Sequence, residues 1–212
     1  MPFAPSRRSF MSVFTSLAGI AAMQATAGEA AGQASTPGDL GWLDGFKGRH
    51  KQVYDFGGVD LTDPLPPLRF PRNYLNSVRD VYRLEFPEVN TAVGISNTAL
   101  PMNMSDAVWQ KYGLGERFTI IDPTTKKPAV RNVFLDGGEF SVKALQARGT
   151  VFWQCQYALN FVAQGLADST GRPLAEVRAD LTAGLNPGAR LVPSHMLALG
   201  LAQERGFTYV RA

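Results

Sequence analysis

One cysteine occupies a position where a reactive group can be built. Cys155, the single cysteine of the chain, lies between an apolar segment typical of a strand and a segment with helical spacing that begins near Tyr157. A thiol at a helix N-terminus is stabilised as a thiolate by the helix dipole and the free amides, which suits a nucleophile or a sulfur carrier. The alternative is a structural cysteine, because free cysteine is among the most buried residue types.

A second candidate group surrounds His195, which follows Ser194 at the expected start of a helix. There the imidazole could act as a base or metal ligand, or it could be hydrogen-bonded and inert. Together with Cys155 and either Met102 or Met104, it would form a soft site of the kind that binds copper. These residues are weak metal candidates, because the sequence does not establish that they converge.

Alternating strands and helices would position these groups. Apolar runs predict six strands, over residues 52–56, 89–95, 118–121, 150–154, 190–192 and 207–210. Helical spacing predicts helices over residues 75–86, 105–113, 141–149, 157–166, 173–184 and 194–205. This alternation indicates an α/β fold with three layers, in which helices cover both faces of a mainly parallel sheet of five or six strands.

The carboxyl ends of parallel strands lie at one edge of the sheet, where ligands of such folds collect. That edge is expected to carry Ser96 and Asn97 after one strand, Cys155 after another, and Ser194 with His195 after a third. Ser96, Asn97, Ser194 and His195 are therefore candidate ligand-binding residues, and Cys155 is the candidate catalytic residue.

The N-terminus has the features of an export signal. Ser6-Arg7-Arg8-Ser9-Phe10-Met11 resembles the twin-arginine signal, and an apolar run from Val13 to Met23 precedes Ala25-Thr26-Ala27, a small-x-small pattern that signal peptidase accepts. The apolar run is too short for a membrane span, so a cleaved signal is expected rather than an anchor. We expect a signal peptide at residues 1–27 and export to the periplasm.

The rest of the chain divides into a linker and one domain. Residues 28–46 are rich in small residues and proline, which predicts a flexible linker. A domain over residues 47–212 follows, with an insertion at about 122–140 where Pro123, Pro128 and Gly137-Gly138 break any periodicity.

Composition excludes several functions. The chain has 212 residues, of which 45% are hydrophobic and 18% charged, as in globular proteins. With Arg7 and Arg8 removed, 19 basic residues remain of 21 against 18 acidic ones, so the net charge falls from +3 to +1. This balance predicts no nucleic-acid partner. No GxGxxG, Walker, HExxH, CxxC or CxxCH motif occurs, and the sequence identifies no cofactor.

Three segments carry a family resemblance. They are Leu145-Gln146-Ala147-Arg148-Gly149 with the strand leading to Cys155-Gln156-Tyr157-Ala158-Leu159, then Leu185 to Ser194 around Asn186-Pro187-Gly188, and finally Leu201 to Val210. They are similar to the DsrE/DsrF-like family of small sulfur-related proteins, over roughly residues 51–121 and 141–212. The resemblance implies a flavodoxin-like or Rossmann-like domain that assembles into trimers or hexamers. It also implies, for some members, sulfur relay as a cysteine persulfide.

Two features of this chain depart from that family. The family's sulfur relays work inside the cell, whereas this chain has an export signal, and His195 stands where the family commonly has glycine. We therefore expect an exported protein that handles sulfur or thiols through Cys155. The alternatives are a periplasmic protein that binds a small ligand, metal or haem, and a non-catalytic accessory subunit of a partner protein. The sequence does not decide whether the protein is an enzyme.

Overall fold

Five strands form one sheet in which every pairing is parallel, in the spatial order β4-β3-β2-β1-β5. The structure is a computed structural model and describes residues 40–62 and 67–212. The strands are β1 (His50–Phe56), β2 (Val89–Ile95), β3 (Val151–Cys155), β4 (Arg190–Val192) and β5 (Thr208–Arg211). The chain adds β1 to β4 in one direction and then returns across the sheet to place β5 beside β1.

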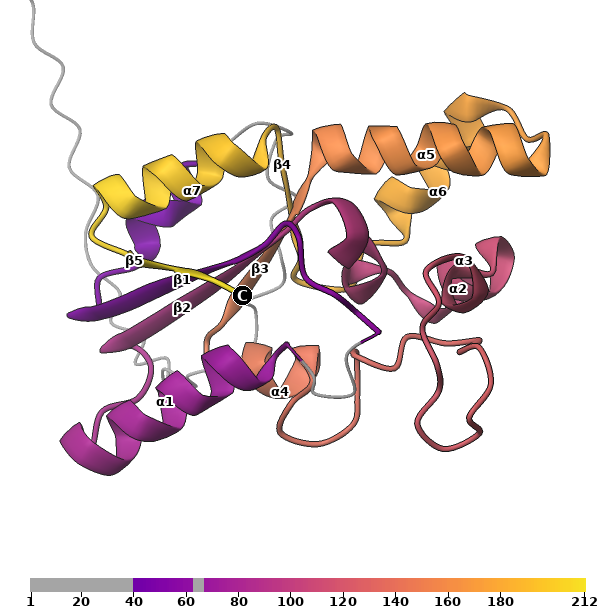
Figure 1. Ribbon diagram of the computed structural model, residues 1–212. Helices are drawn as coiled ribbons and strands as arrows, with labels where there is room; N and C mark the ends of the chain where they lie inside the picture. Colours follow the sequence, from indigo (N-terminus) through magenta and orange to yellow (C-terminus); the bar gives the residue numbers. More distant parts are fainter. Residues whose placement is uncertain (1–39, 63–66) are drawn as a thin grey trace, which may run out of the picture. The chain divides into compact units, whose positions relative to one another are not determined.

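Helices cover both faces of the sheet and give three layers (Figure 1). One face is covered by α1 (Arg69–Tyr82) and α4 (Val142–Ala147), and the other by α7 (His195–Glu204) and the 3-10 helix η1 (Gly41–Gly45). Other helices lie toward the carboxyl ends of the strands: η2 (Asn97–Asn103), α2 (Asp106–Tyr112), α3 (Leu114–Arg117), α5 (Gln156–Thr170) and α6 (Leu174–Ala183). The protein thus has the predicted Rossmann-like α/β fold.

The alternation of side chains along β1 explains the two hydrophobic cores. Val53 packs in the core beneath α7 and η1, whereas Tyr54 and Phe56 pack in the larger core on the opposite face. All seven residues of β2, the middle strand, are buried, and five of the seven are apolar or glycine; the two polar ones are Asn90 and Thr91. Asp55 shares the α7 face with Val53, so β1 places a buried carboxylate in this layer.

One of the six predicted strands, at residues 118–121, is not a strand in the structure. The short helix α3 ends at Arg117, and Thr119 then adopts a positive φ of 56°, which breaks an extended backbone. Ile121 forms only an isolated bridge with Pro128. Residues 118–121 instead form a turn, in which the side chain of Ile120 is buried and that of Ile121 is exposed.

The end of the predicted linker is folded. Residues 1–39, which include the proposed signal peptide and most of the linker, lie outside the described residues. From Leu40 onward, however, the chain packs on the sheet, and η1 buries Leu43 completely in the core beneath α7. Phe46 packs edge-on against Phe207, with ring centroids 5.2 Å apart. The domain therefore includes residues 40–46, because three apolar side chains anchor a segment whose composition resembles a linker.

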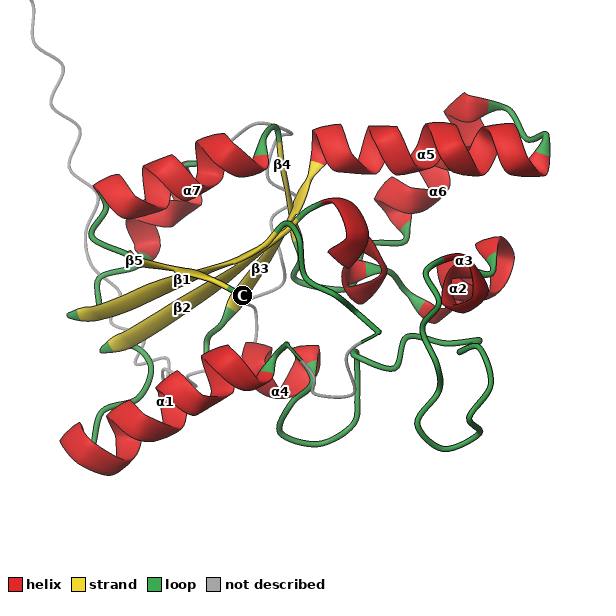
Figure 2. Cartoon of the chain, in the orientation of Figure 1, coloured by secondary structure: helices red, strands yellow, loops and turns green. Residues whose placement is uncertain are grey.

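The predicted insertion between α3 and α4 contains no helix or strand, as Figure 2 shows. Asn132, which is buried, fixes it to η2. Its side-chain amide donates hydrogen bonds to the carbonyl oxygens of Met102 (3.0 Å) and Met104 (2.7 Å), and its side-chain oxygen accepts one from the amide of Phe134 (2.9 Å). Asn132 thus supplies hydrogen-bond partners for two carbonyl groups and one amide group of the backbone that lie outside strands and have no partner in a sheet.

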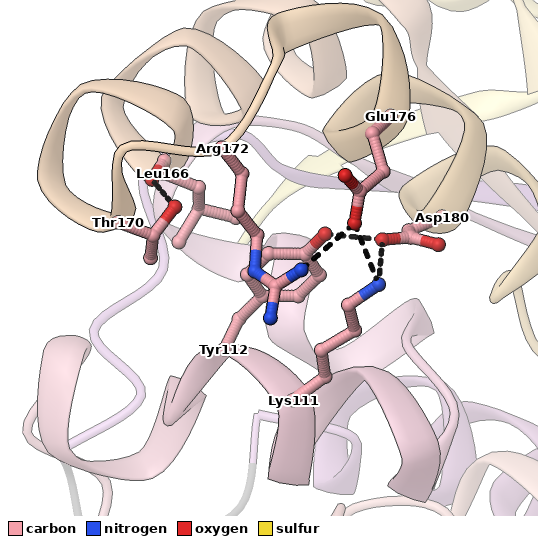
Figure 3. Close-up of polar contacts among 7 residues, drawn as sticks. All are labelled: Lys111, Tyr112, Leu166, Thr170, Arg172, Glu176 and Asp180. Carbon is pink, nitrogen blue, oxygen red and sulfur yellow. Dashed lines mark hydrogen bonds and ion pairs between the residues drawn. The ribbon is translucent and has the colours of Figure 1, made fainter.

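A cluster of charged side chains joins α2 to α6 on the surface (Figure 3). The ammonium of Lys111 lies 3.1 Å from a carboxylate oxygen of Glu176 and 2.6 Å from one of Asp180. The Tyr112 hydroxyl also donates to Asp180, and Arg172 pairs with Glu176 at 2.9 Å. Because these groups are partly solvated, each ion pair contributes little to the stability of the fold.

Candidate functional site

The carboxyl edge of the sheet holds the predicted site residues, as the parallel topology requires. Cys155 and Val192 are register partners at the ends of β3 and β4, and α5 and α7 begin just beyond them. Figure 1 shows that the first turns of these two helices lie at the same edge. This edge is the usual place for a ligand or reactive group in an open α/β sheet.

Cys155 is the N-cap residue of α5, as the sequence predicts for a strand-to-helix junction. Its side chain is 4% exposed and forms no disulfide. The side chain of Cys155 accepts no hydrogen bond from the first-turn amides of α5, whereas Ser141 and Ser194 cap α4 and α7 with their hydroxyl oxygens. No side chain therefore caps these amides, although Cys155 occupies the position from which a side chain would do so.

His195 belongs to a chain of hydrogen bonds that the sequence did not reveal. Its Nε2 lies 2.7 Å from Oδ1 of Asp55, and its Nδ1 accepts a hydrogen bond from the indole N–H of Trp153 at 3.2 Å. The other oxygen of Asp55 accepts a hydrogen bond from the Tyr209 hydroxyl at 2.7 Å. The backbone amide of Gly57 donates to Oδ1 at 2.8 Å. This chain of hydrogen bonds links α7 to β1, β3 and β5.

The indole determines the tautomer of His195. An indole N–H can only donate, so Nδ1 must offer its lone pair, and the imidazole proton lies on Nε2, from which it is donated to Asp55. Both ring nitrogens are thus engaged, and His195 is only 3% exposed. This arrangement leaves no free lone pair for a metal or a substrate proton. The geometry favours the inert, hydrogen-bonded form of His195 over the ligand-binding one.

Gly94 makes room for this chain of hydrogen bonds. In the sheet register it lies between Asp55 on β1 and Trp153 on β3, on the row of side chains that faces α7. A Cβ atom at Gly94 would lie 2.5 Å from Cζ2 of Trp153 and 2.7 Å from Cε1 of His195, far inside van der Waals contact. The two rings therefore occupy the space that a side chain at Gly94 would need.

Hydrogen bonding determines the charge state of Asp55. Burial alone would raise the pKa of its carboxyl group, but the hydrogen bonds from His195, Tyr209 and Gly57 outweigh burial and lower it. The same contact with Asp55, together with desolvation, raises the pKa of the Tyr209 hydroxyl. Asp55 is thus a carboxylate whose acceptor sites are filled by protein donors. The sequence signal for this residue is an acid inside the apolar run 53–56, because a buried acid is almost always partnered.

Met102 and Met104 lie apart from His195. Both are completely buried in the core on the α1 face, while His195 contacts Trp153 of the core on the α7 face. The structure therefore does not bring the predicted soft ligands together. Within residues 40–62 and 67–212, no group of three or more His, Cys, Asp or Glu side chains could hold a metal ion.

The remaining three candidates, Ser96, Asn97 and Ser194, differ in their exposure to solvent. Ser96 is buried and precedes η2, and Ser194 caps α7 by accepting a hydrogen bond from the amide of Leu197 at 3.5 Å. Asn97 is exposed, adopts a positive φ of 44° and donates weakly to the carbonyl oxygen of Gly57 at 3.4 Å. Asn97 is the member of this group whose side chain remains open to solvent.

Comparisons with known proteins do not assign a function. No protein-family model matches the chain, and no curated protein matches it. Among solved structures, the chain is similar to MTH1491 from Methanobacterium thermoautotrophicum, a protein of unknown function. The two are 16% identical, with a TM-score of 0.41, over 77% of this chain and 99% of that one.

Proposed function

We propose that this protein handles sulfur or thiol groups through Cys155, outside the cytoplasm. The observation that carries the proposal is the place of Cys155: it is the N-cap residue of the 15-residue helix α5, at the carboxyl edge of the sheet, and no side chain caps the first turn of that helix. A negatively charged sulfur that turned toward these amides would accept hydrogen bonds from them and would interact favourably with the helix dipole. The DsrE/DsrF-like resemblance around Cys155 points to the same chemistry.

The proposed step is transfer of sulfane sulfur. The thiolate of Cys155 attacks the outer sulfur of a donor persulfide, R–S–SH. A new S–S bond forms on Cys155, the S–S bond of the donor breaks, and the donor leaves as the thiolate R–S⁻. The sulfane sulfur keeps its proton, so Cys155 becomes a persulfide and no external oxidant or reductant is consumed. A second thiolate can take the sulfur by the same exchange.

The low exposure of Cys155 limits what can reach it. Only 4% of its surface is accessible, whereas the nearby side chains of Tyr157 and Met196 are 73% and 71% exposed. A small donor, or the extended thiol of a partner protein, fits this arrangement better than a bulky substrate. The exposed apolar residues at the starts of α5 and α7, Tyr157, Met196 and Leu197, also suit contact between copies of the chain, in the trimers or hexamers that the family resemblance implies.

The location outside the cytoplasm rests on the twin-arginine-like leader, which lies outside the described residues. Among residues 40–62 and 67–212, no helix is long and apolar enough to cross a membrane.

The experiment compares the reaction of Cys155 with polysulfide in the folded and the urea-unfolded protein. We expect the folded chain to gain the mass of one sulfur atom at least as fast as the unfolded chain, with the adduct mapping to Cys155. A structural cysteine would give the opposite order, because burial would protect it until the protein unfolds. That order would overturn the proposal.

A pair of variants tests the role of the helix amides. Tyr157→Pro removes an amide N–H from the first turn of α5, where proline is tolerated, while Tyr157→Ala removes the same side chain and keeps the amide. If the amides stabilise the thiolate, loading should be slower in Tyr157→Pro than in Tyr157→Ala. Equal rates in two folded variants would contradict the mechanism.

A further inference from the structure

A cleft separate from Cys155 lies along the outer face of α5. Its volume is about 480 Å³, within the range of small-molecule sites. Phe161 and Gly165 of α5 form one wall, Arg117 and Phe118 at the end of α3 form another, and Asn97 and Thr98 at the start of η2 close it. The cleft thus joins an apolar helix face to polar groups that follow the carboxyl end of β2.

Gly165 keeps this cleft open. It lies inside α5, where glycine is unfavourable because it raises the entropy of the unfolded chain. A Cβ atom at Gly165 would meet no heavy atom within 4 Å, so packing within the chain does not require glycine here. The missing side chain instead leaves a flat apolar surface beside Phe161, whose ring is 78% exposed. A planar apolar group could stack against this surface.

Arg117 supplies a cation at the edge of the cleft. Its guanidinium donates to the neutral hydroxyl of Ser169, and no carboxylate in the described residues lies within 4.0 Å of it. A guanidinium retains several N–H donors after one hydrogen bond and binds carboxylates in a bidentate manner. Asp168 lies on the same cleft and adds a negative charge, which opposes a dianion such as a phosphate more than a single carboxylate.

We propose that this cleft binds a small organic acid with one carboxylate and a planar apolar body. The carboxylate pairs with Arg117, and the body packs on Phe161 and Gly165. The cleft is lined mostly by apolar atoms, which is the pattern of a small-molecule site. Its polar lining residues are Asn97, Thr98, Arg117, Gln164 and Asp168. This inference goes beyond sulfur handling and does not depend on Cys155.

The test is a titration of the full chain with 3-phenylpropionate, followed by isothermal calorimetry and by amide NMR shifts. We expect saturable binding, with the largest shifts at Phe118 and Gly165. The neutral 3-phenylpropanamide should bind at least about tenfold more weakly, because hydrogen bonds to charged groups are the stronger ones. Arg117→Gln should remove this preference for the acid. Equal binding of acid and amide to the unmodified chain would overturn the proposal.

Two leucine variants separate the cleft from general effects. Gly165→Leu fills the cleft and should abolish binding, whereas Gly200→Leu, at a helical glycine of α7 that also has no heavy atom within 4 Å of its Cβ position, should leave binding unchanged. Unchanged binding in Gly165→Leu would place the probe elsewhere and overturn the proposal. The proposal also fails if 3-phenylpropionate does not bind the unmodified chain and Gly165→Leu dissociates an oligomer. That result would identify the cleft as a contact between copies of the chain.

Discussion

Replacing Gly94 by alanine tests the chain of hydrogen bonds between His195 and Asp55. The new methyl group would lie 2.5 Å from the indole of Trp153 and 2.7 Å from the imidazole of His195. Neither ring can withdraw easily, because the two rings are hydrogen-bonded to each other and both are buried. The backbone or the rings must therefore shift.

The expected cost follows from these contacts. Overpacking a core costs about 1–3 kcal/mol, and disruption of the Trp153–His195 hydrogen bond adds about 1 kcal/mol. Without a clash, the same substitution in a strand would stabilise the protein by about 0.5–1 kcal/mol, because glycine loses more backbone entropy on folding. Because the entropy gain is present with or without a clash, it offsets part of the cost, and we expect Gly94→Ala to lower the free energy of unfolding by about 1–3.5 kcal/mol. The sign of the change therefore distinguishes a clash from open space.

Urea denaturation measures this change, with Gly200→Ala as the matched control. Gly200 lies inside α7 with open space at its Cβ position, so alanine there should stabilise the protein. In a double-mutant cycle, His195→Ala removes one of the two clashing rings, and Gly94→Ala should then cost less than it does beside the intact histidine. A Gly94→Ala protein as stable as the unmodified chain would refute the packing argument.

Three further predictions concern other parts of the fold. The pKa of Asp55 is lower in the folded than in the unfolded chain, so its carboxylate stabilises the fold above about pH 4 and this contribution disappears as pH falls through the folded value. Asp55→Asn should therefore lower the free energy of unfolding at pH 7, and denaturation series at decreasing pH should show the difference shrinking; a constant difference would contradict it. Leu43→Ala should cost about 2 kcal/mol or more in denaturation, because the side chain is completely buried, whereas a flexible linker would show no change. Lys111→Met should cost less than Gly94→Ala, and high salt should remove most of its effect, since the pairs with Glu176 and Asp180 are solvated. A loss that persists in high salt would mean that the ion pairs are not its source.

Local pattern was sufficient to predict most of the fold. The apolar run at 89–95 predicted β2, and the strand-to-helix junction placed Cys155 at the start of α5. Two local errors have physical reasons. The helix predicted over residues 75–86 begins earlier, at Arg69, because proline is tolerated in the first turn of a helix and Pro71 lies in that turn. The run 118–121 has the composition of a strand, yet Thr119 takes a positive φ.

The arrangement around His195 could not be predicted in the same way. Asp55 and His195 are 140 positions apart, and their contact depends on the sheet register and on the absence of a side chain at Gly94. Sequence could place His195 after a strand, but only the position of Trp153 shows that both imidazole nitrogens are engaged. The same limit applied to Met102 and Met104, which lie near a strand end in sequence but point into the core.

The most direct test of the proposed function is the mass of the protein as its own cells produce it. The mature protein is isolated under non-reducing conditions, and the peptide that contains Cys155 is analysed by mass spectrometry before and after treatment with dithiothreitol. We predict a population in which Cys155 carries an extra sulfur atom that dithiothreitol removes. A peptide that contains only the free thiol, in cells actively metabolising sulfur compounds, would contradict the assignment of Cys155 as a sulfur carrier.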